Sequence, residues 1–152
     1  MANQFSKVTT FIIGLFDEMP LVNTISLRDD DVIDVEKENI YPLVSIRAIS
    51  SPAPTQNLRE FSYSIEVLNQ RDDSKTATTS KLLTDTNYID NMNVCDCIAN
   101  NFVMEILKTH NDFNINIIEE TISEFTPIQK DERNSLDGIK FEATFLINQN
   151  AV

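Results

Sequence analysis

Apolar side chains recur every three or four positions in two parts of the chain, and each part predicts an amphipathic helix. The first helix is expected from Gln4 to Met19, with Pro20 stopping it. The second is expected from Asn91 to His110, with Asp90 or Asn91 as the residue that caps its start. The wide apolar stripe of the second helix predicts that it is the main helix of the core. This stripe consists of Cys95, Ile98, Ala99, Phe102, Val103 and Ile106.

Alternation of apolar and polar residues predicts strands between and after the two helices. The two clearest strands are expected at Glu60–Asn69 and Gly138–Asn148. In the first of these, one face is expected to be buried and the opposite face mostly wet, as an antiparallel sheet allows. The buried face is expected to carry Phe61, Tyr63, Ile65 and Val67. Shorter strands are expected at Leu21–Leu27, Ile40–Ile49 and Phe113–Ile117.

Three polar stretches separate these elements. Arg28–Asn39 is acidic and turn-like, and Glu119–Ser135 is expected to be an irregular acidic connection. Gln70–Thr86 has no periodicity and predicts a long polar arm. Long loops inside compact domains are usually functional or mobile, so this arm is expected either to become ordered within an assembly or to remain mobile.

The order of the elements predicts the fold class. It reads helix, strand, hairpin, helix, strand, strand, where the hairpin joins Ile40–Ile49 to Glu60–Asn69. No alternating βαβ rhythm demands a parallel sheet. We therefore predict a single α+β domain over residues 1–152, with a mainly antiparallel, twisted sheet and both helices packed on one face. The centre of its core is expected to contain Phe61, Ile65, Ile98, Phe102, Phe141 and Phe145.

Composition supports a soluble domain with a real core. The chain has 152 residues, of which 41% are hydrophobic, and no apolar run approaches the ~20 residues that a membrane span needs. No secretory signal is predicted at the N-terminus. Cys95 and Cys97 lie about 200° apart around a helix and cannot bond each other. Reduced, buried thiols and folding in a cytoplasm are therefore expected.

The charge excludes several partners. Twelve basic residues against 24 acidic ones give a net charge of −12, and no cluster of Lys and Arg is present. Sequence-independent binding to nucleic acid and adsorption to anionic membranes are therefore not expected, whereas DNA could slide past such a surface. The acidic stretch Asp29–Glu38 lacks the Gly that an EF-hand loop requires. A solvated charge run is expected there, with an opportunistic cation site as the alternative.

The chain shows no recognisable catalytic motif. His110 is the sole histidine, at the expected C-terminus of a helix, where a capping or surface role is favoured. One His and two Cys cannot form a zinc site. Gly14 and Gly138 are the only glycines, so no Gly-rich loop can cradle a phosphate. We predict no catalytic, cofactor-binding or metal-binding residues, no cofactor and no enzymatic activity.

Four segments carry a resemblance to a known family. They are NIYPLVSIRAI at Asn39–Ile49, FSYSIEVLNQRDDSK at Phe61–Lys75, NVCDCIANNFVMEIL at Asn93–Leu107 and ERNSLDGIKFEATFLI at Glu132–Ile147. In this order and spacing, over roughly Leu21–Asn148, the chain resembles bacteriophage tail-terminator or neck (head–tail connector) proteins, common in phages of Bacteroidetes-type hosts. Members of this family often carry an aromatic residue after the Gly of the last motif, where this chain has Ile139.

The resemblance implies a structural virion protein without enzymatic activity. Such subunits have a twisted sheet with two helices on one side and close into rings between the portal or connector and the tail. The resemblance also implies a homo-oligomeric ring of six or twelve copies, with a lumen through which double-stranded DNA passes without specific binding. It further implies that the protein is made in the host cytoplasm and is located in the virion. The alternative is a small acidic intracellular binding or inhibitory protein that mimics DNA.

Overall fold

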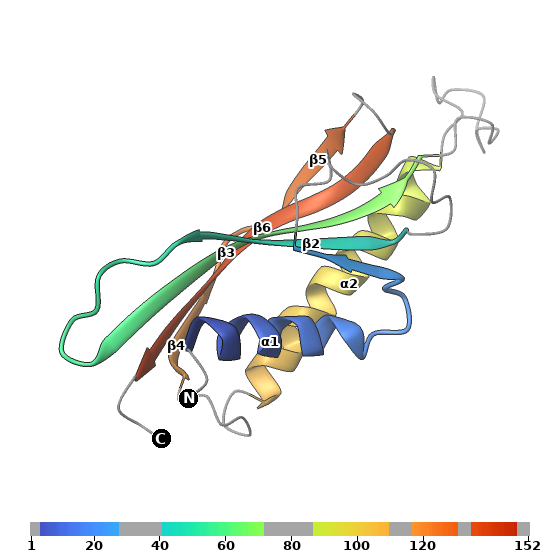
Figure 1. Cartoon of the computed structure of the whole chain (residues 1–152). Coiled ribbons are helices and arrows are strands. Elements are labelled where there is room, and N and C mark those ends of the chain that lie inside the picture. The colour runs from blue at the N-terminus through green and yellow to red at the C-terminus, as the bar shows by residue number, and fades with distance from the viewer. Residues whose placement is uncertain (1–3, 28–40, 72–86, 110–116, 131–134, 149–152) are drawn as a thin grey trace.

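The computed structural model describes residues 4–27, 41–71, 87–109, 117–130 and 135–148 (Figure 1). These ranges contain the helices α1 (Gln4–Asp17) and α2 (Tyr88–Thr109) and the strands β1 (Thr24–Ser26), β2 (Leu43–Ser50), β3 (Leu58–Gln70), β4 (Ile117–Ile122), β5 (Thr126–Lys130) and β6 (Leu136–Asn148). The α+β class predicted from the pattern is therefore confirmed.

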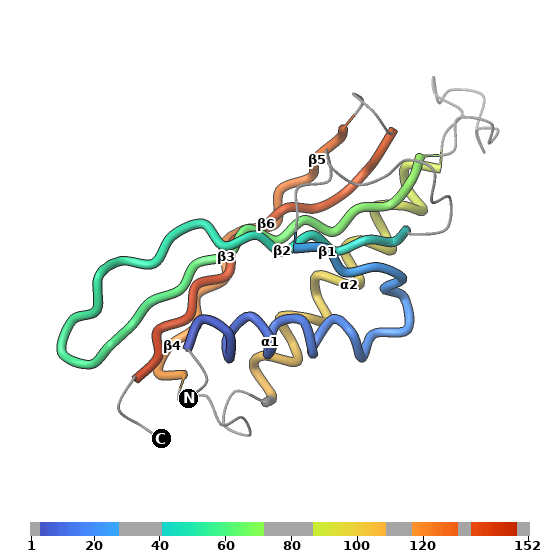
Figure 2. The backbone as a smooth tube through the Cα atoms, in the orientation of Figure 1, coloured from blue at the N-terminus to red at the C-terminus, as the bar shows by residue number. Residues whose placement is uncertain are grey.

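The strands form one mixed sheet. Its order is β1-β2-β3-β6-β4, and β5 pairs with β6 as well. The pairing of β1 with β2 is parallel, and the pairings of β2, β4 and β5 with their neighbours in the rest of the sheet are antiparallel. The prediction of a mainly antiparallel sheet is thus confirmed, with β1 as the exception. The expected hairpin is β2–β3, which turns at Gln56 and Asn57, both with positive φ, and projects beyond the helices (Figure 2).

Both helices pack on the same face of the sheet (Figure 1). The Phe11 ring of α1 meets Phe145 edge-on, with centroids 6.2 Å apart. Between the helices, Phe16 stacks on Phe102 at 4.5 Å, and Phe102 in turn lies 5.8 Å from Phe141 of β6. The six residues predicted for the centre of the core are all buried. The apolar stripes of the two helices therefore pack on the apolar face of the sheet, as their periodicity predicts.

The second side of β3 differs from the prediction. The pattern of Glu60–Asn69 predicts a mostly wet side there, yet Leu68 is fully buried and Ser64 and Glu66 are buried as well. Leu68 belongs to a second, smaller apolar cluster, which also contains Leu43, Leu136, Tyr41 and Ile128. Part of this cover comes from β5, which pairs with β6 and packs Ile128 against the cluster. Lys130 of β5 also reaches Glu66, with Nζ 2.8 Å from Oε2.

The prediction of an irregular connection at Glu119–Ser135 is wrong. This stretch contains most of β4 and all of β5, which follow each other along the same edge of β6. A hydrogen bond from the Ser123 amide to the Glu142 carbonyl bridges the interval between them. The pattern did not reveal these strands because the outer strand of a sheet is half exposed and keeps polar residues on both faces.

The ends of several elements also differ from their predicted positions. The helix α1 ends at Asp17 rather than Met19, and the strand expected at Leu21–Leu27 is the short β1. The helix α2 begins at Tyr88, so neither Asp90 nor Asn91 caps it; the Asn91 amide instead donates to the Asn87 carbonyl within the first turn. Tertiary contacts shift such boundaries by a turn or less.

Other predicted features lie wholly or mostly outside the described residues. They are the acidic stretch Asp29–Glu38, His110, the strand Phe113–Ile117 apart from Ile117, and the polar arm Gln70–Thr86 apart from Gln70 and Arg71. Ile117 is the first residue of β4, and Gln70 is the last residue of β3.

The close approach of β6 to β3 explains why position 138 is occupied by glycine. A Cβ atom at Gly138 would overlap the Val67 carbonyl oxygen and lie 2.7 Å from Leu68 Cδ2. We expect Gly138→Ala to lower the free energy of unfolding by about 1–3 kcal/mol, measured by urea denaturation, because the two strands must move apart. Gly14→Ala is the control: nothing lies within 4 Å of its Cβ position, so this helical substitution should raise stability. If both variants unfolded at the same urea concentration, the proposed clash between a Cβ atom at position 138 and β3 would be wrong.

Candidate functional site: the two edges of the sheet

A buried polar cluster joins β6, the end of β3 and α2. The Asp137 carboxylate is fully buried; its Oδ1 accepts hydrogen bonds from Arg71 Nη2 at 2.9 Å and Nε at 3.2 Å. Its Oδ2 accepts from Asn91 Nδ2 at 3.1 Å, and Asn91 also donates to the Gln70 carbonyl. Asn69 donates to Asn91 Oδ1 at 3.1 Å. The carboxylate is thus compensated on both oxygens, and the cluster fastens the end of β3 to the core.

The sequence contains a signal for this cluster that hydrophobic periodicity alone does not reveal. Asp137 occupies an odd-numbered position of β6, in phase with the buried Ile139 and Phe141. A charged residue on the apolar face of an alternating strand indicates a buried ion pair. The identity of its partner, Arg71, could not be read from the pattern because 66 residues separate the two.

The two cysteines lie in different environments. Cys95 is buried with its Sγ 3.8 Å from the Asp137 carbonyl oxygen, whereas Cys97 is exposed. The prediction of buried thiols is therefore correct for Cys95 and wrong for Cys97, because two residues along a helix reverse the direction of the side chain. Burial, reinforced by the charge of Asp137, raises the pKa of the Cys95 thiol to about 12.

These environments predict selective modification. At pH 8 a maleimide should label one thiol per folded chain, at Cys97, because the Cys95 thiol is both covered and protonated. Intact-mass spectrometry would count the labels. Cys97→Ser should then give an unlabelled native protein that takes up one label after denaturation. Rapid labelling of that variant in its native state would contradict the burial of Cys95.

The described residues contain neither a cluster of metal-binding side chains nor a membrane-spanning helix. No group of three or more His, Cys, Asp or Glu side chains within these ranges could hold a metal ion. Neither of the helices α1 and α2 has the length and apolar run that a membrane span requires. The candidate functional surfaces among the described residues are the edges of the sheet.

Two strands carry a β-bulge with an exposed isoleucine as its extra residue: β2, at the end that extends beyond its pairing with β1, and the edge strand β4. In β2 the register shifts between Ala48 and Ser50, which leaves Ile49 without an opposite residue and 47% exposed. In β4 the register shifts between Ile117 and Glu119, which leaves Ile118 in the same situation and 54% exposed. Bulges at sheet edges re-aim side chains, and both of these present a large apolar group to solvent.

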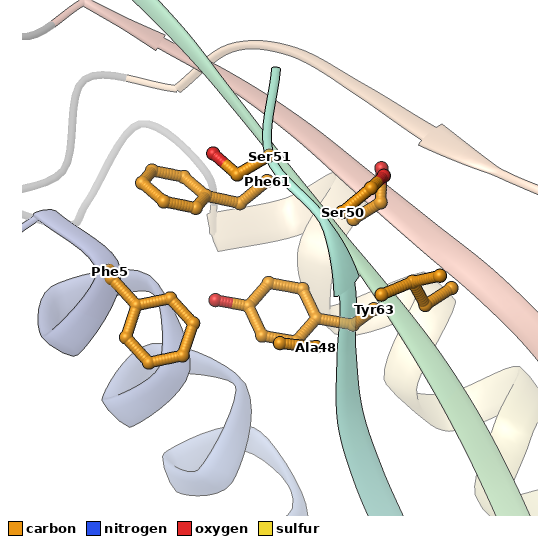
Figure 3. A pocket seen from close by; sticks show the side chains of 8 residues that line it. Phe5, Ala48, Ser50, Ser51, Phe61 and Tyr63 are labelled. Carbon is orange, nitrogen blue, oxygen red and sulfur yellow. The ribbon is translucent and has the colours of Figure 1, made fainter. Parts of the chain in front are cut away.

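A half-open pocket of about 210 Å³, the edge pocket, adjoins the bulge of β2 (Figure 3). It is lined by Phe5 of α1, by Ala48, Ile49, Ser50 and Ser51, and by Phe61, Ser62 and Tyr63 of β3. The Phe5 ring lies 6.1 Å from that of Phe61 and 6.3 Å from that of Tyr63. A hydrogen bond of 2.9 Å between the Tyr63 hydroxyl and Thr9 Oγ1 holds the tyrosine in place. Three of the eight lining residues are thus aromatic, and of these Phe5 is partly exposed whereas Phe61 and Tyr63 are buried.

The two edges differ in charge: Arg47, Arg59 and Glu60 lie at the β2 edge, and Glu119 and Glu120 lie on β4. Beside the edge pocket, Arg59 Nε donates to Ser51 Oγ at 2.8 Å, and its guanidinium carbon lies 4.9 Å from the centre of the Phe61 ring. Arg47 is on β2, two residues before the bulge. The β4 edge, in contrast, has Glu119 and Glu120 and no basic residue. Sequence patterns did not reveal this pair of surfaces, because the edge pocket needs the start of α1 to lie against the β2–β3 hairpin.

The comparisons with known proteins add no further constraint on these surfaces. No protein-family model matches the chain, and no curated protein sequence matches it.

Proposed function

We propose that the protein is a structural subunit of a ring in a bacteriophage neck or tail, with a tail-terminator-like fold. The ring joins the portal or connector to the tail and lets DNA pass. It contains six copies as a tail terminator, or twelve as a connector ring that matches a portal. The subunit has no catalytic role and needs no cofactor, and it reaches the virion from the host cytoplasm.

One observation supports this proposal: among the described residues, Ala48–Ser50 of β2 and the strand β4 each have a strand neighbour on one side only, and each carries an exposed bulged isoleucine. Exposed edges invite pairing with another chain unless they are protected. When the two edges that meet are different surfaces of the same subunit, the contact is heterologous, and repetition gives a ring if the rotation closes. The hairpin between β2 and β3 projects beyond the helices (Figure 2), and Ala48–Ser50 at the end of β2 are exposed.

Charge supports a passive lumen. A subunit with a net charge of −12, repeated around an axis, gives a strongly negative assembly that repels the phosphate backbone. DNA can then move through the ring without being held by counterion-releasing contacts. The acidic stretch Asp29–Glu38, which lies outside the described residues, is proposed to face the lumen or the ring edge.

The mass of the purified full chain in solution tests the ring. Native mass spectrometry and sedimentation velocity should give six or twelve times 17.3 kDa, and negative-stain images should show rings. The protein should also be present in purified phage particles. A monomer at all accessible concentrations, absent from particles, would reject the proposal and favour the acidic binding or inhibitory protein.

Binding to DNA gives a separate test of the passive lumen. At ~150 mM salt, where charges are screened beyond ~8 Å, fluorescence anisotropy should detect no affinity for double-stranded DNA. Binding is not expected because the sequence has no cluster of Lys and Arg to contact phosphates, and its 12 excess negative charges repel them. Submicromolar binding that weakens with added salt would overturn the passive mechanism.

A further inference from the structure

We infer that the ring interface forms when Ile118 of one copy enters the edge pocket of the next copy. Strand β4 of the first copy then lies alongside the end of β2 of the second. The partner at each edge is thus a second copy of this chain, used head to tail. This inference rests on the proposed ring function and names the two surfaces that meet.

The exposure and apolar character of the two surfaces support this pairing. Ile118 is 54% exposed on one edge, and Phe5, which forms one wall of the edge pocket on the other, is 43% exposed. Large apolar side chains at this level of exposure gain from mutual burial. The bulge at Ile118 directs an isoleucine outward, and the bulge at Ile49 interrupts β2 where the edge pocket opens.

The backbone supports the same arrangement. In the described structure, β1 pairs with β2 only at Leu43–Ser45, so Ala48–Ser50 have a strand neighbour on one side alone. The strand β4 likewise pairs with β6 and with no other described strand. Addition of a strand from another chain satisfies such edges with main-chain hydrogen bonds, while side-chain pockets supply specificity.

The charges favour a head-to-tail contact between β4 and the β2 edge over a contact between two β4 edges. Glu120 pairs with Phe145 and so belongs to the face of the sheet that the helices cover, as does Arg59, which pairs with Ile147. Glu119 and Arg47 belong to the opposite face. When the helix-covered faces of the two copies align, a β4 strand beside β2 brings Glu120 and Arg59 to the same face, whereas the opposite face holds Glu60 as well as Glu119 and Arg47. Two β4 edges together would instead face carboxylate against carboxylate.

Mixing of edge variants tests the inference directly. Ile118→Asp alters the β4 edge and Ile49→Asp alters the edge pocket, and both sites are half exposed, so the fold should persist, as checked by thermal unfolding. Each variant alone should sediment at 17.3 kDa. An equal mixture should give a dimer of twice that mass, because one intact β4 edge and one intact edge pocket remain. Ile89→Asp, at a position 70% exposed at the start of α2, is the matched control and should retain the wild-type mass.

The outcomes separate this interface from the ring itself. If wild type is a ring and either edge variant keeps the ring mass, or if their mixture stays monomeric, the interface is wrong while the ring function stands. If one variant alone forms a dimer, the contact joins like edges, and the inference is overturned. If wild type is a monomer at every concentration, the ring function fails and the interface fails with it.

Charge reversal provides a second, independent readout. Glu120→Arg and Arg59→Glu should each raise several-fold the protein concentration at which the ring dissociates, because like charges then meet across the interface. The double variant should return that concentration toward the wild-type value. A double variant that is weaker than both single variants would show that the two side chains do not face each other between copies.

Discussion

Replacing Phe102 with Ala is expected to lower the free energy of unfolding by about 3–5 kcal/mol, since the substitution removes buried area and leaves a cavity. Phe102 is fully buried where the two helices meet the sheet. Its ring stacks on Phe16 with an angle of 3° between the planes and contacts Phe141 on the other side. Close packing from both helices and the sheet limits how far the site can collapse.

Urea denaturation at one fixed protein concentration would measure this loss, because assembly adds to the apparent stability. In a thermal scan, each kcal/mol corresponds to about 2–4 °C for a chain of this size. Met104→Ala is the matched control: it is on the same helix and 45% exposed, and its effect should remain within about 0.5 kcal/mol. A Phe102 variant that melts within a degree or two of wild type would contradict the proposed centre of the core.

Replacing Asp137 with Ala is expected to have an effect of similar size, about 3–5 kcal/mol, because it breaks a buried ion pair. The Asp137 side chain is fully buried and that of Arg71 is 15% exposed. Without the carboxylate, the guanidinium of Arg71 and the amide of Asn91 lose their shared acceptor and stay largely out of water. The cost therefore comes mainly from the unsatisfied partners rather than from the pair itself.

Two further variants separate this mechanism from a general effect of charge. Asp96→Ala removes an exposed carboxylate from α2 and should change the free energy of unfolding by less than about 0.5 kcal/mol. The double variant Asp137→Leu with Arg71→Met removes both charges and should be more stable than Asp137→Ala. The mechanism is wrong if Asp137→Ala unfolds at the same urea concentration as Asp96→Ala.

The elements that the sequence predicted well are those with one fully buried face. In β3 and β6 every second residue faces the core, and in α2 the apolar residues recur with the helical repeat. Burial of one face is therefore visible in the sequence as a periodic pattern of apolar residues. The strands β4 and β5 show no such pattern. They lie at the edge of the sheet, where Glu119 and Thr121 face solvent and Pro127 interrupts the apolar pattern.

The candidate site was predictable only in part. The excess of acidic residues, and the absence of motifs for nucleotide binding, followed directly from the composition. The bulges at Ile49 and Ile118 did not, because a bulge depends on the register between strands rather than on the residues of one strand. The edge pocket required Phe5 to pack beside Tyr63, a contact between residues 58 positions apart.

By itself, the sequence determined the α+β class, the face that each main element buries and the negative charge of the surface, since these follow from local periodicity and residue counts. Tertiary structure alone decided which polar residues are buried, where the sheet ends and what its edges present. Asp137 is tolerated in the interior only because Arg71 and Asn91 reach it from other elements. Ile118 is exposed as the extra residue of a bulge in β4, whose strand partner among the described residues is β6. Such properties depend on neighbours that are distant in the chain, and no local pattern encodes them.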